Sequence, residues 1–441
     1  MGVNLIPVAE AEKLIREHTK TLSPAWLPLQ KAAGLISATD IFATVDIPSF
    51  PQSSMDGYAI SYAGWQKNKI LTIEGESAAG TSESIFLVPE KAVRIFTGAP
   101  IPIGADTVVM QEKTKTENGL LIIEDKTLET GLNVRPKGSE IKAGELALSK
   151  NSMLTPAAIG FLASIGNAEV YVYPTPRISI IITGNELQEP GNPLGYGQVY
   201  ESNSFALKAA LRQLGIHNIY ILRADDTLEI LSEKLTSSLE QSDTVLVTGG
   251  ASVGDYDFVL QAAASCGVEA IFHKIKQRPG KPLFFGKREN KLVFGLPGNP
   301  ASVITCFFEY VAPALARMSN KTFSLQKLKV PLIKSFKKLA GLTHFLKGSY
   351  DGKTVTALDA QESYRLSSFA QANCLIKIDE EVTLCEKGEL VEIHLLPFLS
   401  SDGQHHSFLH ITISCCFFIF FSGPWRGEWL PGVDGIIQHF T

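Results

Sequence analysis

Between residues 177 and 320, apolar runs of β type alternate with helical stretches, and this alternation constrains the fold more than any other feature of the chain. The runs RISIIITGNE and NIYILRAD are followed by the helical stretches SNSFALKAALRQLG and TLEILSEKLTSSLEQ. Strands that are apolar on both faces and joined through helices are typical of a parallel sheet covered on both sides. We therefore predict a doubly wound α/β domain over residues 177–325, with a hairpin at KPLFFGKRENKLVFGLP.

The other parts of the chain predict smaller units. EAEKLIREHTK, LQKAAGLISATDI and MLTPAAIGFLASIG have helical spacing, so residues 1–45 and 140–176 are predicted to form one helical and extended linker domain. Residues 46–139 contain short β runs between Gly and Pro and are predicted to be an inserted β-rich domain. Further short β runs predict a small C-terminal β-barrel over residues 326–398.

The end of the chain has a different composition from the rest. Residues 400–441 contain only four charged residues and no Lys. Their apolar run FLHITISCCFFIFF has 14 residues, whereas a membrane-spanning helix needs about 20. We therefore expect residues 399–441 to be an atypical tail outside the fold. The alternatives are a tail that touches a membrane and a tail that docks on the body of the protein or on a partner.

Composition argues against several classes of protein. Lys and Arg number 40 and Asp and Glu number 45, so no basic excess is available to hold a nucleic acid. None of the six cysteines stands in a CxxC motif, which argues against a disulfide framework and a structural zinc site. The N-terminal residues contain no apolar run typical of a signal peptide. We expect a cytoplasmic protein that binds neither nucleic acid nor membrane.

Chemically useful residues collect in the segments that follow the predicted strands. Ligands of an open parallel sheet bind beyond the carboxyl ends of its strands, so we expect five segments to face one edge. Their glycines allow backbone N–H groups to approach an anion, their carboxylates suit Mg²⁺, and their Lys and Arg side chains suit an oxyanion. Each motif alone is weak, and their convergence favours a functional site. The segments are 183–186, 225–226, 248–257, 278–282 and 296–300.

The sequence gives little support to the standard nucleotide-binding and hydrolase motifs. The GKP sequence around Lys281 is not a Walker A motif, because no Ser or Thr follows the lysine. No GxGxxG opens a strand–helix unit. The GASVG sequence at 250–254 has the GxSxG spacing, but no obvious His base lies nearby in the sequence. Asn299 and Pro300 are typical of the start of a helix, whose N-terminus would point at the same edge and favour an anion.

Eight motifs, in order along residues 5–396, resemble those of the molybdopterin molybdenumtransferase family, the bacterial MoeA-type enzymes related to the C-terminal part of gephyrin. They are SSMDGYA, RIFTGAPIP with GADTVVMQE, NVRPKGSEI, TGNEL, SVGDYD, RPGKP, LPGNPAS and LSSFAQANCLI.

The resemblance implies an enzyme of molybdenum cofactor biosynthesis. Such an enzyme uses Mg²⁺, takes adenylylated molybdopterin and molybdate as substrates, inserts the molybdenum and releases AMP. The resemblance also implies that the α/β domain binds the molybdopterin, that the protein is a homodimer, and that the adenylylating protein hands over the pterin.

The resemblance and the strand-end pattern together assign roles to individual residues. Catalytic roles are expected for Asp56, Thr97, Glu186, Asp257, Lys274 and Arg278. Substrate contacts are expected for Arg135, Glu140, Gly249, Gly250, Ser252, Lys281, Pro297, Asn299, Pro300 and Ser368. Metal ligands are expected to be Glu186, Asp226 and Asp257.

Two departures from the family pattern keep other functions open. Ile182 and Asn185 stand where the family commonly has a hydroxyl and a carboxylate. One alternative is therefore a molybdopterin-binding scaffold without turnover. The other is a nucleotide pyrophosphohydrolase that uses the same α/β domain.

Overall fold

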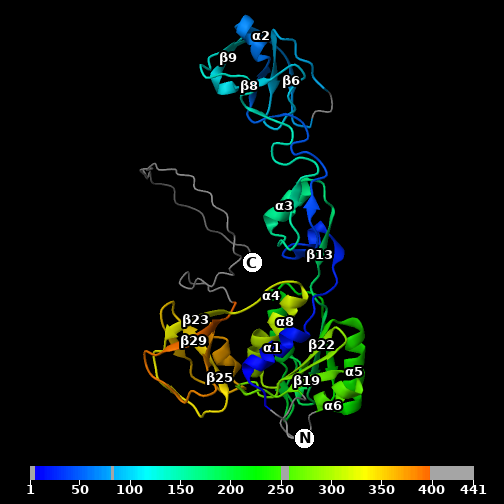
Figure 1. Ribbon diagram of the computed structural model, residues 1–441, viewed down its shortest axis with the longest axis vertical. Helices are drawn as coiled ribbons and strands as arrows, with labels where there is room; N and C mark the ends of the chain where they lie inside the picture. The colour runs from blue at the N-terminus through cyan, green and yellow to red at the C-terminus, as the bar shows by residue number, and fades with distance from the viewer. Residues whose placement is uncertain (1–4, 81–83, 250–257, 398–441) are drawn as a thin grey trace, which may run out of the picture.

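The computed structural model describes residues 5–80, 84–249 and 258–397, and within them the chain is elongated (Figure 1). The sheet of the inserted segment lies at one end, and the α/β sheet and the C-terminal sheet lie together at the other. A narrow segment that contains α3 (Pro156–Ser164) connects the two ends. None of the helices in the described ranges is long and apolar enough to span a membrane.

The α/β sheet has six strands, of which five run in the same direction. In spatial order the strands are β17 (Ile219–Ala224), β14 (Ile178–Thr183), β18 (Thr244–Thr248), β22 (Lys291–Leu296), β21 (Phe284–Arg288) and β19 (Glu269–His273). The first four pair in parallel. β21 is antiparallel to both β22 and β19, because the predicted hairpin reverses the chain. The sheet is therefore mixed, and β14, β17, β18, β19 and β22 all end at one edge, here called the strand-end edge.

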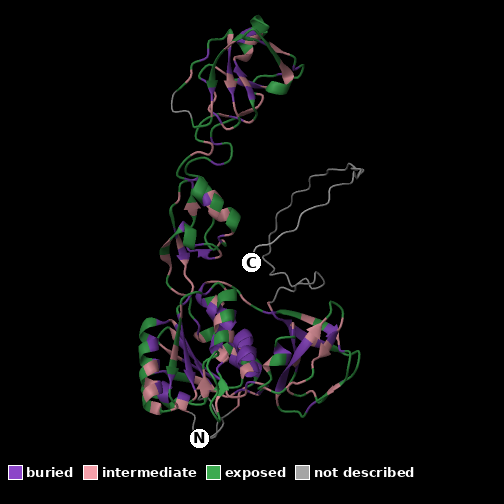
Figure 2. Cartoon of the chain, turned by 180° about the vertical axis from the view of Figure 1, so that it is seen from behind, coloured by how far each residue is buried: buried purple, intermediate pink, exposed green. Residues whose placement is uncertain are grey.

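Both faces of this sheet are buried, as the apolar strands predict. Ile180 and Phe294 pack toward the helices α1, α4, α7 and α8, whereas Ile181 and Val293 pack toward α5 and α6. Figure 2 shows buried residues in the interior of this part of the molecule, with exposed residues on its outer helices. The helices are α1 (Val8–His18), α4 (Asn203–Gln213), α5 (Leu228–Gln241), α6 (Phe258–Ser265), α7 (Pro300–Cys306) and α8 (Ala312–Met318), with the π-helical stretch η3 (Phe307–Val311) between α7 and α8.

The linker segment contains less helix than its sequence predicts. The helices expected from EAEKLIREHTK and MLTPAAIGFLASIG are confirmed as α1 and α3, but α1 packs on the α/β sheet through Val8, Ala11 and Ile15 and is not part of the linker core. The helix predicted over 29–41 is wrong, because that stretch forms only the 3₁₀ turn η1 (Leu29–Lys31), β2 (Ile36–Ser37) and the start of β3 (Ile41–Phe42). Gly34 has a φ of +75°, which ends the turn, and backbone pairing of β2 with β13 (Glu169–Tyr173) then outweighs the helical spacing.

The remaining strands of the linker segment form two small sheets. β1 (Ala25–Pro28) and β2 flank β13, while β12 (Leu146–Leu148) pairs with β3.

The inserted segment forms a six-stranded sheet. Its strands are, in spatial order, β8 (Thr107–Met110), β5 (Gly57–Ile60), β7 (Lys91–Ile95), β6 (Ile70–Ser77), β10 (Leu120–Ile123) and β9 (Thr114–Glu117). Ile60, Leu71 and Leu121 are fully buried in its core. A short helix, α2 (Tyr62–Lys67), is present where the sequence predicted only β structure. At the base of the sheet, β4 (Gln52–Ser53) pairs with β11 (Val134–Arg135).

The C-terminal strands form a sheet whose two ends meet. The strand order is β20 (Gln277–Arg278), β25 (Thr343–Tyr350), β27 (Cys374–Ile378), β29 (Leu390–Leu395) and β23 (Gln326–Pro331). β26 (Val355–Ala357) pairs with β25. Val355 of β26 also forms a bridge to Leu332, just after β23, and this bridge connects the β23 end of the sheet to the β25 end. β20 is contributed by the α/β segment, which ties the two parts together.

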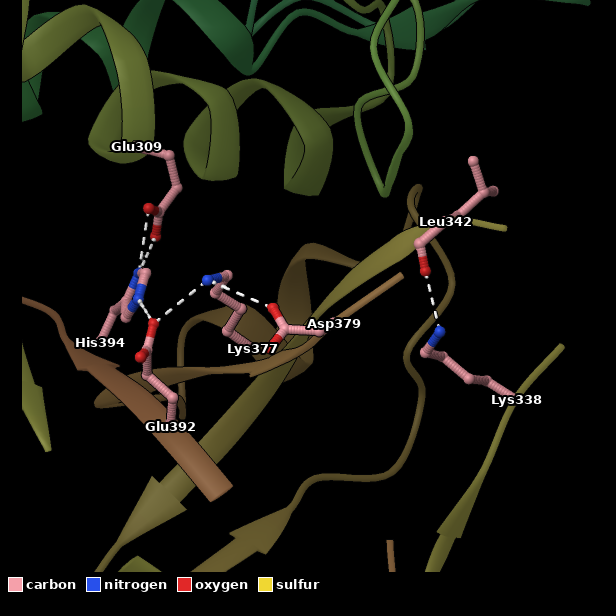
Figure 3. Close-up of polar contacts among 7 residues, drawn as sticks. All are labelled: Glu309, Lys338, Leu342, Lys377, Asp379, Glu392 and His394. Carbon is pink, nitrogen blue, oxygen red and sulfur yellow. Dashed lines mark hydrogen bonds and ion pairs between the residues drawn. The ribbon is translucent and has the colours of Figure 1, made fainter. Parts of the chain in front are cut away.

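A polar network lies where the C-terminal sheet packs on η3 (Figure 3). The His394 side chain is completely buried, and its Nδ1 lies 2.8 Å from Glu309 Oε1. Its Nε2 lies 3.0 Å from Glu392 Oε1, which also pairs with Lys377. Both ring nitrogens face carboxylates and can donate to them, an arrangement that favours the charged imidazolium.

Candidate functional site

Backbone segments after three strands meet at the strand-end edge. Gly249 follows β18 with a φ of +82°, and a Cβ atom there would lie 2.6 Å from Thr183 Oγ1 at the end of β14. A Cβ on Gly298, after β22, would lie 3.8 Å from the Cα of Gly249. Only glycine permits the approach at 249. Three of the five predicted segments therefore lie side by side.

Two of the predicted metal ligands follow neighbouring strands. Glu186 and Asp226 come after β14 and β17, and the Asp226 N–H donates to Asn185 Oδ1 at 3.4 Å, which links the two segments. Neither carboxylate forms an ion pair with another described residue, so their oxygens suit a hard cation such as Mg²⁺. Within the described ranges no group of three or more His, Cys, Asp or Glu side chains could hold a metal. Asp257, Gly250 and Ser252 lie outside the described residues.

Two buried polar atoms near this edge lack partners in the part of the chain that the structure describes. They are Thr248 Oγ1, at the end of β18, and Asn203 Oδ1, at the start of α4. The amide of Asn203 donates to Gly298 O at 2.9 Å, which places this side chain beside the glycine segments. An unsatisfied buried acceptor or hydroxyl is costly unless a ligand or water supplies a partner. Thr248 lies within the predicted segment 248–257 but was assigned no role of its own, and Asn203 was not predicted.

The loop from Lys274 to Lys281, here called the cation loop, follows β19 at the same edge. Lys274 has a φ of +77°, a strained backbone conformation for a residue other than glycine. The Ile275 N–H donates to Lys281 O at 2.9 Å, so the loop closes on itself. Lys276 pairs with Glu380 of the C-terminal segment at 2.6 Å. Lys274, Arg278 and Lys281 have no carboxylate partner among the described residues, which leaves three charges for an anion.

The start of α7 also faces the C-terminal segment. Pro300 occupies the first helical turn and Asn299 is the N-cap residue, as predicted, but the Asn299 side chain does not cap the helix. Its amide donates to Ser363 Oγ at 2.9 Å, and the Ala301 N–H donates to Ser363 O. Pro297 is buried. Ser363 was not predicted, since no local pattern marks it.

Ser368 is held away from solvent. It is 7% exposed, and its hydroxyl donates to Ala360 O at 2.8 Å. The buried Lys347 ammonium donates to the same carbonyl at 2.7 Å, and also to Glu362 O and Arg365 O. In this structure Ser368 and Lys347 fix the loop that carries Ser363.

The predicted residues of the inserted segment form a second group. Asp56 Oδ1 accepts from the Thr97 N–H at 2.7 Å and from Thr97 Oγ1 at 2.8 Å, and these bonds hold the pKa of Asp56 below its usual range. Arg135 in β11 is the backbone partner of Gln52 in β4, and these two strands form a small sheet of their own. Next to it the Ser54 N–H donates to Asn133 O. Glu140 is exposed, and its N–H donates to Ile47 O.

The two groups lie at opposite ends of one chain. Asp56 and Thr97 belong to the inserted sheet at one end, whereas the strand-end edge lies at the other end near Ile6, which bridges to Ile275 (Figure 1). A single chain therefore does not bring Asp56 or Thr97 to Glu186 or Lys274. A cavity of about 350 Å³ between α1, α8 and residues 321–327 contains none of the predicted site residues.

Comparison with known protein families matches three stretches of the chain. A MoeA N-terminal region (domain I and II) matches residues 6–166 and a probable molybdopterin binding domain matches residues 179–317. A MoeA C-terminal region (domain IV) matches residues 329–396, so the predicted tail lies beyond the matched residues.

Whole-chain relatives agree with these matches. A molybdopterin molybdenumtransferase of Haemophilus influenzae is 36% identical over 399 residues, which cover 87% of this chain and 98% of the relative. A molybdopterin molybdenumtransferase of Nostoc sp. is 34% identical over 412 residues, or 89% of this chain and 92% of the relative. The crystal structure of a molybdopterin biosynthesis MoeA protein from Pyrococcus horikoshii superposes with a TM-score of 0.73 at 30% identity, covering 89% of this chain and 99% of that one.

Proposed function

The chain belongs to the molybdopterin molybdenumtransferase family, and on that premise we propose that it inserts molybdenum from molybdate into adenylylated molybdopterin and releases AMP with Mg²⁺. The observation that carries this proposal is the strand-end edge. At this edge the segments after β14, β18 and β22 meet through glycine backbone, two carboxylates without cationic partners follow β14 and β17, and three cations without carboxylate partners follow β19. Both molybdate and the pyrophosphate linkage are oxyanions that need such donors.

In this proposal the described residues have three different roles. Lys274, Arg278 and Lys281 bind and orient the oxyanions and offset their charge. Glu186 and Asp226 would hold Mg²⁺, which when bound stabilises negative charge on phosphate oxygens. Thr248 Oγ1 provides a hydroxyl at the floor of the site.

We further propose that the working unit is a cytoplasmic homodimer with shared sites, supplied with pterin by the adenylylating protein. The separation of the two residue groups within one chain supports this arrangement. Asp56, aligned by Thr97, would then present its carboxylate to the substrate from the second subunit. Closed two-fold symmetry is the commonest arrangement of such assemblies and gives two equivalent sites.

The function is tested by incubating the protein with adenylylated molybdopterin and Mg²⁺, with and without molybdate, and measuring AMP. We expect molybdate to stimulate AMP release strongly. Equal AMP release without molybdate would indicate a pyrophosphohydrolase. Binding of the pterin without AMP release in either condition would indicate a scaffold.

Substituting Arg278 by alanine should raise the molybdate concentration needed for half-maximal AMP release about ten- to a hundredfold. A charge-assisted hydrogen bond to the oxyanion, worth roughly 1.5–3 kcal/mol, is lost. Arg288→Ala is the matched control, since Arg288 ends β21 at the opposite edge of the same sheet and should leave the molybdate dependence unchanged. An unchanged molybdate requirement in Arg278→Ala would remove Arg278 from this role.

A further inference from the structure

The cation loop is held in shape by buried, uncharged groups behind it. Gln277 lies between Lys276 and Arg278, yet its side chain is completely buried. Its amide nitrogen donates to Pro279 O at 2.7 Å, and its Oε1 accepts a hydrogen bond from the Tyr310 hydroxyl. Because Pro279 and Gly280 separate Arg278 from Lys281, the orientation of the Pro279 carbonyl fixes the backbone between two of the cations.

Tyr310 reaches the loop from the π-helical stretch η3 and is itself only 1% exposed. π-Helical turns are rare and occur frequently at functional sites. Burial raises the pKa of the Tyr310 hydroxyl well above its ordinary value, so the group remains a proton donor at neutral pH.

The loop also packs closely on the residues behind it. Gly280 has a φ of +97°, and a Cβ atom there would lie 2.6 Å from Cys306 Sγ and 2.9 Å from Gln277 Nε2. The loop therefore packs directly on α7. Its other side is held by backbone contacts, because the Lys276 N–H donates to Ile6 O and the Thr343 N–H donates to Lys276 O.

From these contacts we propose that Gln277 and Tyr310 are positioning residues for the oxyanion site, acting through Arg278 and Lys281. The inference rests on the proposed function and deepens it, since it assigns to two uncharged buried residues the placement of the charges that bind molybdate. Neither residue touches the substrate. Without the Tyr310 hydroxyl, Gln277 Oε1 is a buried acceptor without a donor, and the amide is no longer held toward Pro279 O.

The test is the molybdate dependence of AMP release in Tyr310→Phe. We expect the KM for molybdate to rise roughly two- to tenfold, as for loss of one buried hydrogen bond, while kcat at saturating molybdate changes less than about twofold. Tyr350→Phe, which removes a hydroxyl that donates to Gly352 O in the C-terminal segment, is the control and should leave both values unchanged. Gln277→Met, which removes both hydrogen bonds, should raise the KM at least as much.

A double-substitution cycle separates positioning from a general structural effect. In an Arg278→Ala background, Tyr310→Phe should raise the molybdate KM clearly less than it does alone, because one of the groups it positions is absent. A lower kcat or lower thermal stability with an unchanged KM, or full additivity with Arg278→Ala, would overturn the inference. Failure of the proposed function is a separate result, because it would appear as molybdate-independent AMP release, or none, in the unsubstituted protein.

Discussion

Replacing His394 by alanine should lower the free energy of unfolding by about 3–5 kcal/mol, one of the largest single-residue effects that we expect in this protein. The substitution leaves the Glu309 carboxylate, whose side chain is only 4% exposed, without its cationic partner. It also removes the link between η3 and the C-terminal strands through Glu392 and Lys377 (Figure 3). Breaking one side of a buried ion pair costs far more than removing both sides.

Equilibrium denaturation of the purified variants measures this effect. His217→Ala, at an exposed position, is the matched control and should change stability by less than about 0.5 kcal/mol. Glu309→Gln combined with His394→Ala should recover much of the loss, because no buried charge then remains unpaired. A loss below about 1 kcal/mol in His394→Ala would show that the network contributes little to stability.

The same histidine should make stability depend on pH above its ordinary pKa of about 6.5. Burial of the ring opposes its charged form, but the hydrogen bonds and charge of Glu309 and the hydrogen bond to Glu392 together raise its pKa. A raised folded-state pKa means that the stabilisation is complete below the unfolded value of about 6.5 and is lost as pH rises through the folded value. We expect the difference in unfolding free energy between the unsubstituted protein and His394→Ala to shrink over that window. A difference that stays constant would contradict the charged form.

His344 should make stability depend on pH below about 6.5. Burial, with the nearby charges of Lys338 and Arg278, lowers its pKa to about 4. A lowered folded-state pKa for a histidine means that its contribution is lost as pH falls from about 6.5 toward 4. The two histidines can therefore be separated by measuring stability on each side of this value.

The α/β sheet could be predicted because its pattern depends on local sequence. Apolar residues such as Ile180 and Ile181 face opposite sides of β14 and are both buried, so a continuous apolar run is the expected signal for such a strand. The predicted helix over 29–41 failed because its spacing is ambiguous, and pairing with β13, more than a hundred residues away, decides the outcome. β20 could not be predicted for the same reason, since a two-residue strand is defined only by its partner β25.

The position of the residues at the strand-end edge could be predicted from the topology of the sheet. Once β14, β18, β19 and β22 are known to run in the same direction, the segments after them must lie along one edge of the sheet, which places their glycines and cations there. The buried contacts that shape this edge could not be predicted. The partners of Gln277, Ser363 and Lys347 are set by packing between distant segments, and nothing in the local sequence distinguishes these side chains from ordinary surface residues.

The second large effect should come from combining two inactive variants. Asp56→Asn and Glu186→Gln each remove one carboxylate charge with little change of shape, and each homodimer should be inactive because both of its sites are damaged. In a mixed dimer with shared sites, one site receives both substitutions and the other receives neither. Equal random reassortment gives about half mixed dimers, so activity should return to about a quarter of that of the unsubstituted protein.

Purified mixed dimers provide the most direct measurement of the central claim, that the inserted sheet of one chain and the strand-end edge of another complete one molybdate-inserting site. Co-expression of the two variants with different tags isolates the mixed species, and molybdate-dependent AMP release is then measured per dimer. We predict about half the activity of the unsubstituted dimer, from one intact site of two. A mixed dimer as inactive as its two parents would show that Asp56 and Glu186 act within one chain, and would contradict the account.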